Sequence, residues 1–592
     1  MPLARTTTRL PRPAIAASLA LLALFLCNRP AGGQTPLPVG GQAAGFELSD
    51  VEGVSWSVAA DASAEPLVVV FMGHQCPMVR QYVPRLNELQ KQFADHGIRW
   101  LAINSNQQDS LAELQAFVRR SGLVIPLLKD PGNRVADQFG ATRTPEVFLL
   151  DGDLRVQYHG RIDDQFAPGI QRPRAVQHYL EDALEALVTG EPVSRSTTKP
   201  AGCIIGRLLK PDGNEPATVT WHNQISRIVQ KNCQSCHRAG EIGPFALGSW
   251  EEAAGWAGMI QEVVNQGRMP PWHASPEHGV FSNDSRLTSD EIEMINTWVD
   301  SGAPQGNPSD APDPVEWTVG WQIGEPDVVL PMDDRPWRVP ATGTVEYQYF
   351  QVDPGFTEDK WVTAAECRPG NRAVIHHIIV GIRGAGDFGR RSHRGLQSDW
   401  IAAAAPGSPA MTLPPGYAKK IPAGSKLVFQ IHYTPDGTAT TDLSSIGLKF
   451  LDPEAVTHQV MTLKAFNRKF VIPPNKDNKR VTARFRFERE SELLSLFPHM
   501  HVRGKSFRYT AEFPDGSKEI LLDVPRYDFN WQNAYELTQP RLIPAGTWFA
   551  CVAHFDNSAN NLANPDPEET VRWGDQTWEE MMIGYFNVAV EK

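Results

Sequence analysis

The hydrophobic pattern of this 592-residue chain changes twice, and one core cannot satisfy all three patterns. Strand-like and helix-like runs alternate over residues 43–190, short helical patterns follow over 216–305, and short alternating strands fill 320–592. Stretches rich in proline, glycine and polar residues, 191–215 and 306–319, are predicted to be linkers. The sequence therefore predicts a multidomain chain: an α/β domain, a small all-α domain, and two all-β sandwiches at 320–453 and 454–592.

The first residues predict export. Arginines precede an apolar run over about 14–26, and small residues follow up to Gly33, which is typical of a secretory signal over residues 1–33. An uncleaved anchor is the alternative, but the run is shorter than the ~20 residues that span a bilayer. We expect a periplasmic or secreted protein with no transmembrane segment in the mature chain. A net charge of −12 without a long basic run makes nucleic acid an unexpected partner.

A cysteine opens the first predicted helix. Cys76 in "FMGHQCPMVRQY" follows the strand "PLVVVFM", and a helix start lowers a thiol pKa. Together with "TRTPEVFLL", where Thr144–Pro145 could be a cis bond beside the thiol, residues 43–190 resemble the thioredoxin-like redoxins. Val79 stands where a C-x-x-C motif has its second cysteine. Cys76 is a candidate redox thiol or a structural cysteine, and Cys203, beyond this domain, could resolve its sulfenate or disulfide.

The helical segment carries a haem-attachment motif. "CQSCH" is C-x-x-C-H, in which two cysteines bind haem covalently and the histidine ligates the iron; the residues are Cys233, Cys236 and His237. Met269 in "RMPPW" is the candidate sixth ligand, with His273 and His278 as alternatives. No second C-x-x-C is present to complete a zinc site. Residues 216–305 resemble a small c-type cytochrome through "CQSCH" and "RMPPW", which implies covalent haem c.

Three motifs in the strand-rich region are rich in histidine. They are "NRAVIHHIIVG", "LVFQIHYTP" and "LFPHMHVRGKSF", with His376, His377, His432, His499 and His501. Neighbours on a strand face opposite ways, so adjacent histidines need a bend to share one metal ion. Histidines two residues apart share one face. Imidazole together with a soft thioether suits copper.

Residues 320–592 resemble the copper type II, ascorbate-dependent monooxygenases, the peptidylglycine α-hydroxylating and dopamine β-monooxygenases. The resemblance implies two jelly-roll sandwiches with one copper ion each. It implies an electron-transfer copper held by His376, His377 and His432. It implies an oxygen-binding copper held by His499, His501 and Met581 of "WEEMMIGYF", with Met582 as the alternative ligand.

The chain departs from that family near the expected substrate. Phe497 stands where the peptide hydroxylases have an arginine that holds the substrate carboxylate, and Arg503 need not face the pocket. Only Cys367 and Cys551 remain for the family's paired cysteines. Tyr585 matches a family tyrosine near the substrate. A glycine-extended peptide is therefore not supported, and the substrate, a small molecule or a peptide, stays open.

The motifs together predict an exported copper-dependent monooxygenase that hydroxylates a C–H bond with O₂. Electrons would come from an external reductant or redox protein through the fused haem. Two alternatives stay open. One is a non-catalytic copper or electron-transfer protein, and the other is a thiol-based peroxide-defence protein led by Cys76.

Overall fold

The structure is a computed structural model that describes residues 35–60, 65–207, 217–384, 400–405 and 410–592. The predicted secretory signal, residues 1–33, lies outside this part of the chain. Within the described ranges, no helix is long and apolar enough to cross a membrane.

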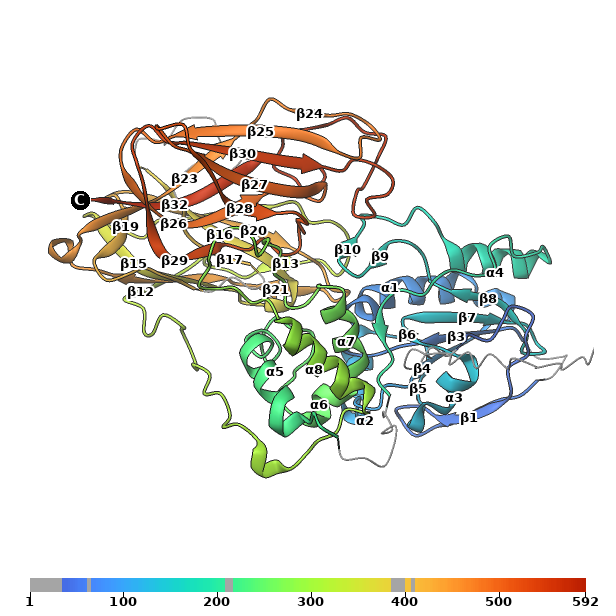
Figure 1. Cartoon of the computed structure of the whole chain (residues 1–592). Helices are drawn as coiled ribbons and strands as arrows, with labels where there is room; N and C mark the ends of the chain where they lie inside the picture. Colours follow the sequence, from blue (N-terminus) through green and yellow to red (C-terminus); the bar gives the residue numbers. More distant parts are fainter. Residues whose placement is uncertain (1–34, 61–64, 208–216, 385–399, 406–409) are drawn as a thin grey trace, which may run out of the picture.

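The amino-terminal domain is built on a five-stranded mixed sheet, which confirms the α/β prediction (Figure 1). In sheet order its strands are β5 (Leu127–Lys129), β4 (Arg99–Asn104), β3 (Leu67–Phe71), β7 (Glu146–Leu150) and β8 (Val156–Gly160). The first three run parallel, and β7 runs antiparallel to both its neighbours. One face packs against α1 (Pro77–Gln92), α2 (Leu111–Ser121) and α4 (Tyr179–Thr189). The other packs against α3 (Arg134–Phe139) and the hairpin of β1 (Phe46–Ser49) and β2 (Ser55–Val58).

Four short α-helices form the second unit. They are α5 (Ser226–Asn232), α6 (Trp250–Gly255), α7 (Ala257–Asn265) and α8 (Ser289–Asp300). Their apolar faces meet around the buried rings of Trp256 and Trp298. A capping box begins α8, because the Thr288 side chain accepts a hydrogen bond from the Glu291 backbone N–H and the Glu291 carboxylate accepts one from the Thr288 backbone N–H. This unit lies below the sheets and beside the amino-terminal domain (Figure 1).

The rest of the chain is β-structure in two sandwiches that share one long sheet. Its order is β12 (Val328–Pro331), β22 (Ser445–Phe450), β15 (Lys360–Arg368), β19 (Tyr417–Ile421), β23 (His458–Phe466), β32 (Ile583–Glu591), β26 (Ser491–His499) and β29 (Tyr535–Ile543), with β18 (Met411–Thr412) beside β15. Parallel pairing of β19 with β23 joins the two halves.

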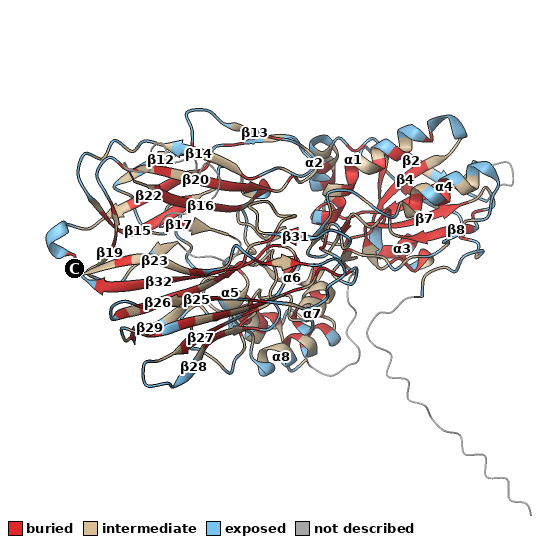
Figure 2. Cartoon of the chain, turned by 90° about the horizontal axis from the view of Figure 1, so that it is seen from above, coloured by how far each residue is buried: buried red, intermediate tan, exposed pale blue. Residues whose placement is uncertain are grey.

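Each half of the long sheet faces a second sheet. The first is covered by β14 (Gln348–Val352), β20 (Lys426–Tyr433), β16 (Ile375–Arg383) and β17 (Trp400–Ala404). The second is covered by β25 (Lys479–Arg486), β30 (Trp548–Phe555), β27 (Gly504–Glu512) and β28 (Lys518–Val524). Two short strand pairs lie outside these sheets, β13 (Trp337–Val339) with β21 (Thr440–Asp442) and β24 (Val471–Ile472) with β31 (Val571–Arg572). Buried residues concentrate along the main strands (Figure 2), and each sandwich has its own core.

A segment between α7 and α8 docks the helical unit onto the second sandwich. The ring of Trp272 lies 4.9 Å from that of Tyr535, and Trp272 and Phe281 belong to the sandwich core. Phe281 also bridges to Leu537 of β29. The Ser275 backbone N–H donates to the Asp523 carbonyl at 2.7 Å. The helical unit is therefore held against the β region by packing and by backbone hydrogen bonds.

Candidate metal centre and redox thiol

A β-bulge brings the adjacent histidines to one side of β16. Ile375 pairs with Tyr433 and His377 pairs with His432, so His376 is the extra residue between two registered pairs. One potential ligand atom from each of His376, His377 and His432 lies within 4.8 Å of the others. The bulge supplies the bend that two neighbouring histidines need in order to face one ion.

The three imidazoles have the chemical form of metal ligands. Burial lowers the pKa of His376 to about 4 and holds those of His377 and His432 well below the usual value. All three are therefore neutral near pH 7, with a ring nitrogen lone pair. Within the described residues, His376 Nε2 and His432 Nδ1 are buried without a hydrogen-bond partner. A buried nitrogen without a partner costs desolvation free energy unless a ligand binds it. Three neutral imidazoles are a donor set that suits a copper ion.

The second histidine pair lies at the end of β26. The rings of His499 and His501 are 5.3 Å apart. His499 Nδ1 lies 2.6 Å from Gln532 Oε1, and His501 Nδ1 lies 3.0 Å from the Glu579 carbonyl oxygen. Both contacts leave Nε2 for an ion, and His501 Nε2 is buried without a partner in the described structure. Burial lowers the pKa values to about 4 for His499 and about 3 for His501.

Glu580 ties the two motifs of this second set together. Its carboxylate accepts backbone N–H bonds from His501 at 2.9 Å, Arg503 at 2.7 Å and Met581 at 3.2 Å. Burial raises the pKa of Glu580 to about 7 against these bonds. The Arg503 guanidinium is fully buried and donates to Asn557 Oδ1 at 2.7 Å. The Arg503 side chain is therefore engaged in structural hydrogen bonds, to Asn557 and to the Trp578 carbonyl.

The two candidate methionines face different surroundings. Met582 is fully buried in the core of the second sandwich. Met581 is half-buried, packs in a small cluster with Trp400 and Tyr585, and lines a cavity together with His499. Of the two methionines, Met581 is therefore the one that lies beside His499.

The two histidine sets face each other across the boundary between the sandwiches. Tyr347 of the first sandwich lies between them, with ring centroids 4.8 Å from His432 and 6.4 Å from His501. Phe529 of the second sandwich stacks on His376 at 5.3 Å and lies 6.0 Å from His501. One aromatic ring from each sandwich therefore separates the sets.

The cavity beside Met581 has a volume of about 320 Å³. Besides Met581 and His499 it is lined by Tyr347, Gln430, Trp400 and Tyr585, and two cations, Lys464 and Arg468, lie at its wall. Because His499 and Met581 line this cavity, an organic molecule bound there would lie beside the second histidine set.

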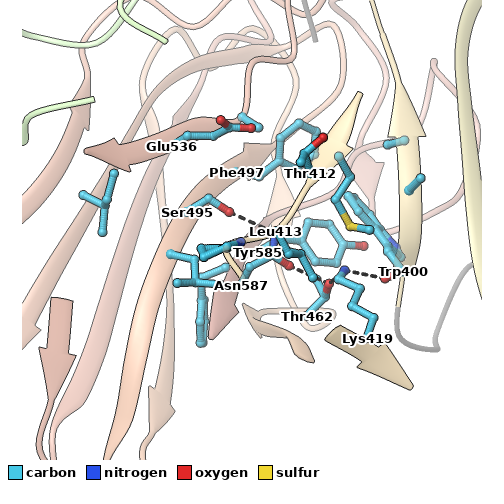
Figure 3. Close-up of a pocket in the computed structure, with 18 of the residues that line it drawn as sticks. Trp400, Thr412, Leu413, Lys419, Thr462, Ser495, Phe497, Glu536, Tyr585 and Asn587 are labelled. Carbon is cyan, nitrogen blue, oxygen red and sulfur yellow. Dashed lines mark hydrogen bonds between the residues drawn. The ribbon is translucent and has the colours of Figure 1, made fainter. Parts of the chain in front are cut away.

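A neighbouring cavity of about 270 Å³ lies between the two sandwiches (Figure 3). The rings of Trp400 and Tyr585, 4.3 Å apart, line both cavities and separate them. Phe497, at the place of the expected arginine, lines this second cavity. A polar chain follows its floor, from Lys419 Nζ to Thr462 at 2.8 Å, Thr462 to Asn587 at 2.7 Å, and Asn587 to Ser495 at 2.9 Å.

The haem-attachment motif lies at the end of α5. His237 Nδ1 is 3.0 Å from the Phe245 carbonyl oxygen, which leaves Nε2 for iron, and the thiols of Cys233 and Cys236 are free. The residues therefore fit a covalent haem. The loop after the motif touches the first sandwich, where Glu241 pairs with Arg372 at 3.1 Å. Ile242 and His376 line one small cavity, so the loop after the motif borders the first histidine set.

Met269 lies at the junction of the domains. It lines a cavity of about 660 Å³ together with His273, His376 and His432. The other alternative ligand, His278, lies in the turn that follows. The structure therefore places the predicted sixth ligand of the haem on the same cavity as two of the predicted copper ligands.

In the amino-terminal domain, Cys76 is the N-cap residue of α1, directly after β3. Its sulfur lies 3.1 Å from the Thr144 carbonyl oxygen, and the Thr144–Pro145 bond is cis. Burial raises the Cys76 pKa, but hydrogen bonds from the thiol and backbone of Cys203 and from the Val79 backbone outweigh it, and the pKa falls to about 6. The arrangement is that of a poised thiolate.

Fold and thiol together define a thioredoxin-like redoxin domain, and the comparisons agree. Residues 39–159 match the AhpC/TSA family. Thiol-disulfide oxidoreductase ResA of Halalkalibacterium halodurans is 28% identical over 128 residues, covering 21% of this chain and 71% of that protein. ResA of Geobacillus thermodenitrificans is 28% identical over 124 residues, covering 21% and 70%.

Among solved structures, the hypothetical protein SMc02350 from Sinorhizobium meliloti 1021 is 31% identical and covers 29% of this chain and 95% of its own, with a TM-score of 0.27. The AhpC/TSA match covers residues 39–159 of the amino-terminal domain, and each of these ResA matches covers 21% of the chain. They show that this part of the chain is a redoxin domain, similar to proteins of the AhpC/TSA family and to ResA.

Proposed function

We propose that the chain is an exported copper-dependent monooxygenase that hydroxylates a C–H bond with O₂ and receives its electrons through a haem c in its helical unit. The observation that carries the proposal is the bulged strand β16. The bulge lets one potential ligand nitrogen from each of three imidazoles lie within 4.8 Å of the others, opposite a second histidine pair with a methionine nearby.

His376, His377 and His432 would hold one copper ion, and His499, His501 and Met581 the other. When bound, copper supplies one-electron transfer and O₂ chemistry, and haem c supplies one-electron transfer. Gln532 and the Glu579 carbonyl contact Nδ1 of the second pair, so that each Nε2 is left for an ion. Glu580 fixes the spacing between that pair and Met581.

The protein groups around the second set favour an organic substrate. The adjoining cavity of about 320 Å³ is lined by aromatic rings, which bind apolar surface, and by the charged side chains of Lys464, Arg468, Asp575 and Glu579, which bind polar groups. Tyr585 and Trp400 form its wall towards the second cavity. Substrate bound in this space would be oriented by those rings beside Met581 and His499.

The packing of the helical unit against both sandwiches supports its proposed role as electron donor. Cys233 and Cys236 would attach the haem, His237 would ligate its iron, and Met269 is the proposed sixth ligand. The Glu241–Arg372 pair and the docked segment around Trp272 hold this unit against both sandwiches. Close, fixed approach favours electron transfer over release of a diffusing carrier.

Copper loading and O₂ consumption of the full chain test the proposal. Metal-free protein should bind two copper ions, and His432→Ala and His499→Ala should each lose one. With copper and an added reductant, O₂ uptake should rise with an accepted C–H substrate and be lost in either variant. Two bound ions without any O₂ consumption would leave a non-catalytic copper or electron-transfer protein. A single ion lost in both variants would contradict two separate sites.

A further inference from the structure

A short strand outside the redoxin sheet reaches the active thiol. β11 (Cys203–Ile204) pairs antiparallel with β6 (Arg143–Thr144), with Cys203 opposite Thr144. Ile205 N–H donates to the Thr142 carbonyl at 2.9 Å, and Gly206 N–H donates to Asn106 Oδ1 at 2.9 Å. This part of the predicted linker is therefore fixed to the redoxin domain.

Glycine allows the close approach. A Cβ on Gly202, which has a φ of +140°, would lie 2.0 Å from the Thr144 carbonyl oxygen. Arg143 donates to the Gly202 carbonyl at 2.8 Å and also pairs with Glu262 of α7. The residue after Gly202 is thus clamped between the redoxin domain and the helical unit.

That residue is Cys203, and its sulfur contacts the sulfur of Cys76. Its thiol and backbone N–H both hydrogen-bond to the Cys76 sulfur. The Cys203 side chain packs against the core of the redoxin domain and also against that of the helical unit. Cys76 is fully buried, whereas Cys203 is only half-buried, so Cys203 is the more accessible of the two.

We propose that Cys76 and Cys203 form one redox-active dithiol, which closes to a disulfide when it reduces a disulfide of another molecule. Val79, where C-x-x-C motifs have their second cysteine, is fully buried and apolar and cannot take part. The second sulfur instead comes from β11. The chain thereby gains a thiol–disulfide exchange site that is independent of copper and haem.

The exchange balances in two steps. Cys203, the accessible sulfur, passes its proton to the Cys76 sulfur that it contacts and attacks the incoming disulfide, forming a mixed disulfide and releasing one thiolate. Cys76 gives that proton to the released thiolate and attacks the Cys203 sulfur, which forms the Cys76–Cys203 bond and releases the second thiolate. Two electrons pass from the dithiol to the external disulfide, whose released sulfurs take up protons as thiols.

Disulfide mapping on the intact full chain tests the proposal directly. The protein is equilibrated with dithiothreitol over a range of oxidised-to-reduced ratios, acid-quenched, alkylated and digested. The Cys76–Cys203 linked peptide should rise from absent to dominant as the ratio increases and fall again on return to reducing buffer. Cys367 and Cys551, both buried in the sandwiches, should be recovered as alkylated free thiols at every ratio and serve as the internal control.

Matched variants separate the chemistry from folding. Cys203→Ser should abolish the linked peptide and leave Cys76 at least about tenfold slower to react with oxidised dithiothreitol, because Cys76 has no exposed surface. Adding Val79→Cys to that variant should restore an oxidisable pair. The proposal is overturned if both cysteines of the unmodified chain stay alkylated at every ratio, or if Cys76 pairs with Cys367 or Cys551.

Discussion

Replacing Gln532 by leucine should weaken copper binding at one site and spare the other. The Gln532 oxygen accepts the short 2.6 Å contact from His499 Nδ1, which fixes the tautomer that presents Nε2. Loss of such an orienting partner reduces metal affinity by about tenfold to a hundredfold, or about 1.4 to 2.8 kcal/mol. Because the contact is short and both residues are buried, we expect the upper part of that range.

Gln430→Leu is the matched control at the other site. Gln430 Oε1 lies 3.3 Å from His377 Nε2, a longer contact, so about tenfold or less is expected there. Each change is measured in both single-site backgrounds, His432→Ala, which leaves the His499 site, and His499→Ala, which leaves the His432 site. The assay is a copper titration in competition with a chromophoric chelator. Equal effects of either glutamine on both sites would refute the reasoning that two separate, individually oriented sites exist.

Three further outcomes follow from single side chains. Met581→Leu should weaken copper at the His499 site in the same titration, whereas Met582→Leu should leave copper unchanged and cost less than about 1.5 kcal/mol in denaturant unfolding; the reverse pattern would exchange the two assignments. The rate of Cys76 alkylation, followed by mass spectrometry, should be half-maximal near pH 6, because hydrogen bonds lower the Cys76 pKa to about 6 and the thiolate persists above that pH. A midpoint near ~8.5 would indicate an ordinary thiol. Gly202→Ala should displace β11 and destabilise the chain by more than about 1 kcal/mol, since its Cβ would meet a carbonyl oxygen at 2.0 Å; unchanged proteolysis at this strand would count against the clamp.

The redoxin domain could be predicted because its signals are local. The pattern of apolar residues predicts buried strands such as Leu67–Phe71 and the amphipathic helix Pro77–Gln92. The proline after Cys76 marks the start of that helix. The pairs His376–His377 and His499–His501 could be recognised for a similar reason, since their members are adjacent or two residues apart. His432 and Met581 were joined to these pairs only by the resemblance to the copper monooxygenases. The β-bulge at His376 was only implied, as a bend that two adjacent ligands require.

The residues that support the sites were not predictable, because their partners are distant in the chain. Gln532 reaches His499 from a loop 33 positions away, and Glu580 holds His501 from 79 positions away. Glutamine and glutamate are common surface residues, so neither carries a signal by itself. Cys203 stood in a stretch with linker composition, and only the pairing of β11 with β6 brings it to Cys76. The shared sheet depends in the same way on the long-range pairing of β19 with β23.

Reoxidation of the haem by O₂ tests whether the haem passes its electrons to the copper sites. The haem of the full chain is reduced, excess reductant is removed, O₂ is mixed in, and haem absorbance is followed by stopped flow. Oxidation should be fast in copper-loaded protein, and slow after copper chelation and in His432→Ala, because a haem with His237 and Met269 as axial ligands has no open position for O₂. One rate in all three samples would contradict the account, since the haem would then not serve the copper.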